Sequence, residues 1–117
     1  MSRPRVPERG GKLTLVLIQV FCVPECRNCQ PAIARVREVL ASEGIAAPIE
    51  EILVVEEATA RALRFPGSPT VRINGADVES SGDRAVGVAC RLYSDGTGLP
   101  SEAALRDAIL AARSQEQ

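Results

Sequence analysis

The sequence contains no histidine, and thirteen of its 14 basic residues are arginine. Without histidine there is no imidazole general base, no histidine-ligated metal and no cysteine–histidine dyad. The chain also lacks an excess of charge of either sign, because 14 basic residues face 15 acidic ones. The basic residues are scattered along the chain, so we expect no nucleic-acid surface. Any chemistry must therefore rest on cysteine, carboxylate or backbone groups.

A hydrophobic run long enough to span a bilayer is also missing. The longest apolar stretch, residues 13–23, is too short for that. It follows several basic residues, as the hydrophobic part of a signal peptide does, but no small-residue cleavage site comes after it. Removing it would also delete the first predicted strand. We therefore expect a cytoplasmic protein that does not bind membranes.

Cysteine is scarce, and its distribution is uneven. Three of the four cysteines lie close together, at Cys22, Cys26 and Cys29, and the fourth is Cys90. This clustering does not suit the disulfide framework of a secreted protein and indicates a reactive or metal-binding site in a reducing cytosol. Taken singly, Cys22 and Cys90 also fit small buried hydrophobic positions.

Hydrophobic periodicity predicts one α/β domain at residues 12–114, between a flexible N-terminal arm at 1–11 and a tail at 115–117. We expect a central mixed β-sheet of four to five strands, flanked by helices on both faces and with an antiparallel edge. A helix N-cap is predicted at Ser101, and Asn74-Gly75 is a hairpin signal. The predicted strands are residues 13–21, 49–55, 70–73, 76–78 and 85–93, and the predicted helices are residues 32–41, 56–63 and 101–112.

The most informative motif is Cys26-Arg27-Asn28-Cys29, which lies between the first strand and the first helix. A thiol at the first turn of a helix feels the positive end of the helix dipole, and this favours the reactive thiolate. Glu25 opposes a thiolate on the first cysteine, whereas Arg27 supports it. A second thiol two residues further on can close a disulfide ring.

Together with the Phe65-Pro66-Gly67-Ser68-Pro69-Thr70 turn about forty residues later, this motif resembles the thioredoxin-like superfamily. The chain is most similar to small bacterial thioredoxin-family proteins with an FPGSPT turn and a later CRLY segment, and some relatives of that kind carry an alkylmercury lyase label. The resemblance implies a cis peptide bond before Pro69, Cys26 as the attacking thiol and Cys29 as the resolving thiol. We predict that Ser68, Pro69, Thr70 and Arg27 contact the substrate.

Four positions depart from ordinary thioredoxins. Glu25 stands where they carry tryptophan, Arg27-Asn28 replaces Gly-Pro, and Val20 stands where they carry a buried acid. The chain also has about a dozen more residues between Pro69 and the last helix, and these have room to cover or extend the site.

Three functions remain open from the sequence. The first is a thiol:disulfide oxidoreductase that needs no cofactor, acts on a protein or small-molecule disulfide and takes electrons from an unidentified donor. The second is a protein that binds soft metals or cleaves organomercurials, with mercury, zinc or copper held by Cys22, Cys26, Cys29 and Cys90. The third is a non-catalytic interaction module. Arg72 and Arg91 are expected on solvated strand faces.

Overall fold

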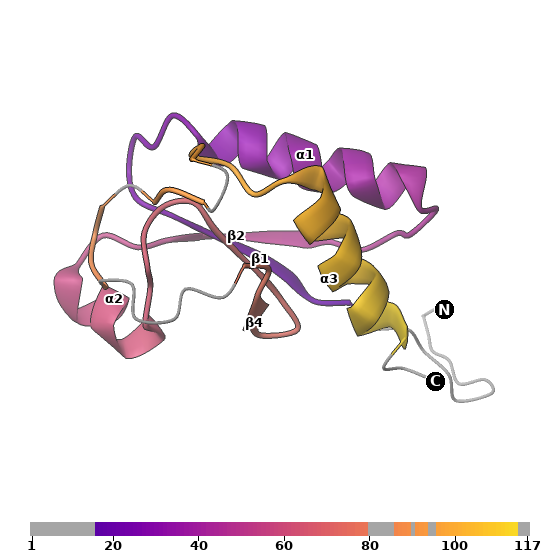
Figure 1. The fold of residues 1–117 in the computed structure, drawn as a ribbon. Coiled ribbons are helices and arrows are strands. Elements are labelled where there is room, and N and C mark those ends of the chain that lie inside the picture. The colour runs from indigo at the N-terminus through magenta and orange to yellow at the C-terminus, as the bar shows by residue number, and fades with distance from the viewer. Residues whose placement is uncertain (1–15, 80–85, 90, 94–95, 115–117) are drawn as a thin grey trace, which may run out of the picture.

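The computed structural model describes residues 16–79, 86–89, 91–93 and 96–114, so the predicted arm, the predicted tail and Cys90 lie outside the described residues. Within the described part, no helix is long and apolar enough to cross a membrane. The elements of this part are β1 (Ile18–Cys22), α1 (Cys29–Ser42), β2 (Ile49–Leu53), α2 (Glu57–Leu63), β3 (Thr70–Ile73), β4 (Ala76–Asp77) and α3 (Glu102–Ser114) (Figure 1).

The strands of the described residues form one mixed sheet in the order β2-β1-β3-β4. β1 pairs with β2 in parallel, while β3 pairs with β1, and β4 with β3, in antiparallel fashion. The sheet therefore has the antiparallel edge that the Asn74-Gly75 turn predicts. Asn74 and Gly75 have φ angles of 53° and 86°, and a tight two-residue hairpin turn of this type requires such left-handed values.

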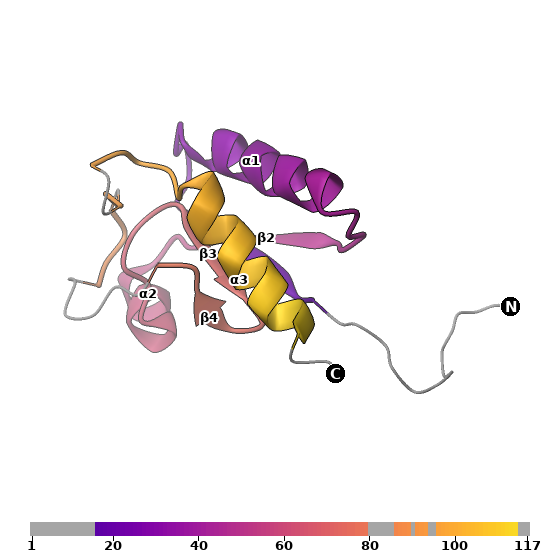
Figure 2. The same ribbon diagram turned by 45° about the vertical axis from the view of Figure 1, so that its right-hand side comes forward.

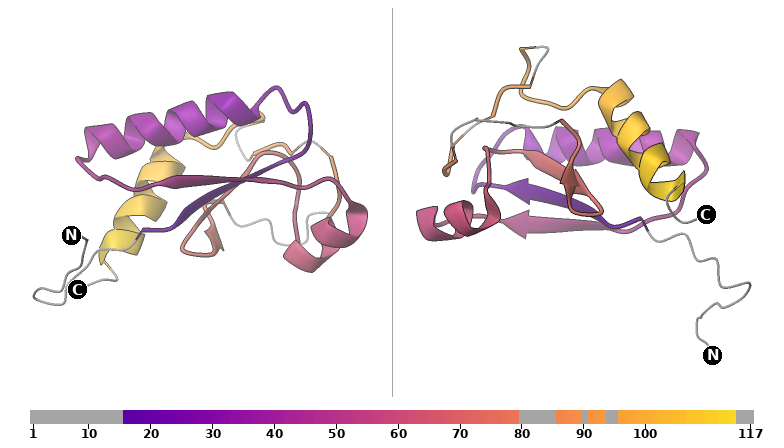
Figure 3. Two further views of the ribbon diagram at one scale, coloured as in Figure 1. Left: turned by 180° about the vertical axis from the view of Figure 1, so that it is seen from behind. Right: turned by 60° about the horizontal axis from the view of Figure 1, so that its bottom comes forward.

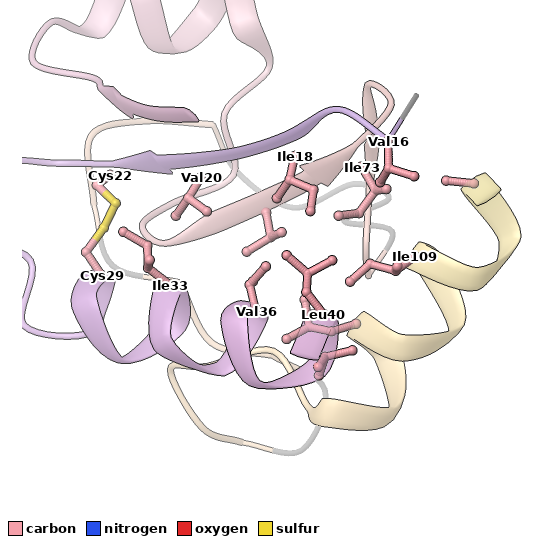
Figure 4. Packing of buried hydrophobic residues seen from close by; sticks show 14 residues of the cluster. Val16, Ile18, Val20, Cys22, Cys29, Ile33, Val36, Leu40, Ile73 and Ile109 are labelled. Carbon is pink, nitrogen blue, oxygen red and sulfur yellow. A yellow bond between two sulfur atoms is a disulfide. The ribbon is translucent and has the colours of Figure 1, made fainter. Parts of the chain in front are cut away.

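Helices cover both faces of the sheet, as predicted. α1 and α3 pack against each other on one face, and α2 lies on the other side, near the end of β1 (Figures 2 and 3). Since side chains alternate along a strand, Ile18, Val20 and Cys22 of β1 point to α1 and α3, while Phe21 packs with residues of α2. We call the first cluster the main core. Its buried members are Val16, Ile18, Val20, Cys22, Cys29, Ile33, Val36, Val39, Leu40, Val71, Ile73, Leu105, Ile109 and Ala112 (Figure 4).

The fifth predicted strand, residues 85–93, is not a strand in its described part. Its residues instead pair with the loop that precedes β3. The Gly87 amide donates to the Phe65 carbonyl (3.1 Å), and Ser68 exchanges two hydrogen bonds, donating to Ala89 (2.7 Å) and accepting from Arg91 (3.0 Å). β3 itself has no free edge for this segment, since β1 and β4 lie on its two sides.

Candidate active site

The cysteine loop connects β1 to α1 through two successive turns. The Cys26 amide donates to the Val23 carbonyl (3.3 Å), and the Cys29 amide donates to the Cys26 carbonyl (3.4 Å). Within the first turn, Glu25 has a left-handed φ of 64°, which is strained for a residue with a side chain. α1 then begins at Cys29 with Asn28 as its N-cap. Cys29 thus lies in the first turn of the helix, and Cys26 lies in the turn before it.

The structure joins Cys29 to Cys22 in a disulfide, whereas the sequence motif led us to expect Cys29 to pair with Cys26. The Cα atoms of the bonded residues are 6.1 Å apart, and the residues are only 1% and 5% exposed. They meet because the inward-facing end of β1 lies opposite the first turn of α1 (Figure 4). Cys22 is therefore buried, as one interpretation of the sequence had it, and it is also bonded to Cys29.

Cys26 is the free thiol of the described residues. Its side chain is half-buried and packs against the main core, which contains the Cys22–Cys29 disulfide. Arg27, the next residue, is exposed. A partly accessible thiol therefore lies beside a buried disulfide.

The proline turn is tied directly to the cysteine loop. The Ser68–Pro69 peptide bond is cis, and the Ser68 hydroxyl accepts a hydrogen bond from the Val23 amide (3.0 Å). Ser68, Pro69 and Thr70 are all buried. The Ser68 amide and carbonyl already bond to Ala89 and Arg91. These two Ser68 backbone groups are therefore not open to an extended substrate in this structure.

Arg91 is a structural residue that the sequence interpretation placed wrongly on a solvated face. It is only 1% exposed, and its guanidinium forms a two-pronged ion pair with Asp77 (2.8 and 3.1 Å). It also donates to the Thr70 hydroxyl (3.1 Å) and the Glu79 carbonyl (2.6 Å) and stacks on the Tyr93 ring, 4.2 Å from the ring centroid. No sequence pattern predicts the Arg91–Asp77 ion pair, because Asp77 follows the Asn74-Gly75 turn and resembles an ordinary turn residue.

Tyr93 stabilises the proline turn. It is buried, and its hydroxyl donates a 2.6 Å hydrogen bond to the Pro69 carbonyl.

We expect Tyr93→Phe to lower the free energy of unfolding by about 1–3 kcal/mol, because the buried carbonyl loses this donor. Urea denaturation measures the change. Leu92→Ala, at an exposed neighbouring side chain, should stay within about 0.5 kcal/mol of the wild type, and an equally small change for Tyr93→Phe would contradict the expectation.

The extra residues before α3 reach the cysteine loop. Gly98 lies so close to Asn28 that a Cβ atom at Gly98 would overlap the Asn28 amide nitrogen. In Figures 1 and 3 the described part of this segment passes beside the N-terminal end of α1. Gly98 therefore covers the loop between Cys26 and Cys29 at Asn28.

The cysteines described here are not arranged as a metal site. Among the described residues, no group of three or more cysteine, aspartate or glutamate side chains could hold a metal ion. Cys22 and Cys29 are bonded to each other, and Cys90, the fourth thiol of the soft-metal hypothesis, lies outside the described residues.

A mixed sheet in the order β2-β1-β3-β4, with a helix that follows directly from a cysteine loop on β1, defines a thioredoxin-like protein. Residues 16–85 match the family model of the thioredoxin domain, and the chain belongs to that family. Membership indicates thiol-based redox chemistry. No curated protein matches the sequence. The matched range ends at residue 85, so it does not include Arg91, Tyr93 and Gly98. These three residues contact the proline turn and the cysteine loop from a part of the chain that the family model does not cover.

Proposed function

We propose that the protein is a thiol:disulfide oxidoreductase in which Cys26 attacks and Cys29 resolves. The observation that carries the proposal is a free, half-buried Cys26 thiol one turn before a cysteine whose sulfur is already in a disulfide. A thiol that solvent can reach, held next to a second cysteine, is the minimum equipment for exchanging disulfides. The reaction needs no cofactor.

In the reducing direction both Cys26 and Cys29 begin as thiols. The Cys26 thiolate attacks one sulfur of a substrate disulfide and forms a mixed disulfide with it, while the other substrate sulfur leaves as a thiolate. Cys29 then attacks Cys26, which releases the second substrate sulfur and leaves the enzyme oxidised. The position of Cys29 in the first turn of α1 supports its role, because the helix N-terminus stabilises the thiolate that must attack.

The proposed substrate is a protein or small-molecule disulfide, and the proposed setting is the bacterial cytoplasm. Arg27 is exposed beside Cys26 and supplies a cation for an acidic group near the substrate disulfide. Ser68, Pro69 and Thr70 are buried, so we assign them first to shaping the site. They contact an extended substrate only where it displaces Ala89 and Arg91 from the Ser68 backbone.

Equilibration in glutathione buffers tests this function. The protein is purified without chelators under reducing conditions, its metal content is measured, and its cysteines are alkylated after equilibration over a range of glutathione ratios. We expect Cys29 and one partner cysteine to be protected and released together as one reversible two-electron couple, with negligible metal. Stoichiometric soft metal that protects three or four cysteines would instead favour the metal-binding alternative, and absence of any reversible couple would favour a non-catalytic module.

A further inference from the structure

We propose that Cys22 takes part in the reaction as the third member of a cysteine relay, in which the disulfide moves between an outer pair, Cys26–Cys29, and an inner pair, Cys22–Cys29. This inference rests on the proposed oxidoreductase function and adds a residue to it. Its basis is the observed inner disulfide together with the free thiol of Cys26 beside it.

Burial decides which sulfur can meet an external partner. Cys22 and Cys29 are 1% and 5% exposed, so a substrate or reductant in solution has almost no access to the inner disulfide. Cys26 is more exposed than either and packs against the same core. Oxidation and reduction of the inner disulfide must therefore pass through Cys26, unless the domain opens.

Cys29 is the shared member because the fold holds it close to both partners. On one side it is bonded to Cys22 at the end of β1. On the other side a single turn links it to Cys26, closed by the hydrogen bond from the Cys29 amide to the Cys26 carbonyl. Cys22 is held in its place because the peptide group that follows it is clamped, with the Cys22 carbonyl accepting from the Val54 amide (2.7 Å) and the Val23 amide donating to the Ser68 hydroxyl (3.0 Å).

The relay step is an internal exchange with no net oxidation. The Cys26 thiolate attacks the sulfur of Cys29, an S–S bond forms between them, and the Cys22–Cys29 bond breaks. Cys22 leaves as a thiolate and takes up the proton that Cys26 gave up. The outer disulfide can then oxidise a substrate dithiol, which becomes a disulfide as Cys26 and Cys29 become thiols. In the reducing direction the same steps run backwards, and the oxidised protein comes to rest with its disulfide in the core.

The test follows each cysteine of the full chain during oxidation. Reduced protein is mixed with oxidised glutathione, quenched with acid at increasing times, unfolded and alkylated. Tryptic cleavage after Lys12 and Arg27 separates the peptide that carries Cys22 and Cys26 from the peptide that carries Cys29. Fragmentation of the first peptide then shows which of its two cysteines was labelled.

We expect the label on Cys26 to disappear first and to return later, while the label on Cys22 disappears as that of Cys26 returns. The matched variant Cys22→Ala should stop at the outer disulfide. Its oxidised form should be reduced by dithiothreitol at least about ten-fold faster than the wild type, because only the outer form is open to attack and the wild type populates it as a minor state.

Two other outcomes are decisive in different ways. If Cys26 and Cys29 stay protected while Cys22 remains labelled throughout, the relay is wrong and the proposed oxidoreductase function stands. If none of these cysteines exchanges with glutathione, the proposed function fails and the relay fails with it. The wild-type time course answers the question even where Cys22→Ala folds poorly.

Discussion

Replacement of Cys26 by serine is expected to lower disulfide reductase turnover at least about 100-fold, to the uncatalysed background, because the proposed mechanism uses Cys26 as the attacking nucleophile. Serine cannot take over at neutral pH, since a hydroxyl without a neighbouring base is a poor nucleophile. The chain contains no histidine that could serve as such a base. The assay follows reduction of a small-molecule disulfide by the protein in the presence of excess dithiothreitol, corrected for the reaction without protein.

Two further variants make the loss interpretable. Cys29→Ser should retain attack by Cys26 but accumulate a covalent adduct between Cys26 and the substrate, visible as a mass increase. Cys90→Ser removes a thiol to which the mechanism gives no role, and its turnover should match the wild type. Cys26 is only half-buried, and its hydrogen bonds with Val23 and Cys29 use backbone atoms that serine keeps. The free energy of unfolding of Cys26→Ser should therefore lie within about 0.5 kcal/mol of the wild-type value. Full turnover in a folded Cys26→Ser protein would exclude the proposed mechanism.

Replacement of Arg91 by methionine is expected to cost about 3–5 kcal/mol of stability, because it leaves the Asp77 carboxylate without its cation. The Arg91 side chain is fully buried and that of Asp77 is only 14% exposed, so water can replace few of the lost contacts. A domain of this size has a total stability of only about 5–15 kcal/mol. The variant should therefore be close to unfolding at room temperature, which urea denaturation measures directly.

The matched control is Arg106→Met. Arg106 pairs with Glu43 at 3.0 Å, but these side chains are 35% and 25% exposed, and ion pairs open to solvent contribute only about 0–1 kcal/mol. The double variant Arg91→Met with Asp77→Asn should recover part of the loss, because it removes the uncompensated charge. If Arg91→Met were no more destabilising than Arg106→Met, the buried Arg91–Asp77 pair would contribute no more stability than an ion pair open to solvent.

The arrangement of helices and strands followed from local signals. The apolar run before the cysteines predicted β1, and helical spacing from Ala32 onward predicted α1, which begins three residues earlier, at Cys29. Ser101 was predicted as an N-cap, and its hydroxyl accepts from the Ala104 amide (3.0 Å). These features depend on residues a few positions apart, so a linear pattern is enough to find them. Residues 85–93 alternate like a strand, but whether a strand forms depends on which backbone groups the fold brings beside the segment, and a linear pattern does not contain this information. Here the neighbouring backbone groups belong to Phe65 and Ser68 in the loop before β3.

The candidate site was predictable in part. The motif at Cys26 and Cys29 and the turn at Ser68-Pro69 were visible because their spacing is local, and the fold places both at the same end of β1. The contact of Gly98 with the cysteine loop could not be predicted, because it joins Asn28 to a residue seventy positions later in the chain.

From its sequence alone, this chain carries a thioredoxin-like fold and a cysteine pair at the start of a helix. Tertiary structure alone decided that Cys29 is bonded to Cys22 and that Arg91 is buried against Asp77. The reason is physical: a disulfide forms only between sulfurs that the backbone brings within bonding distance, and a buried charge is tolerated only where the fold supplies its partner. Both conditions concern distances in space between segments that come from different strands, helices and loops.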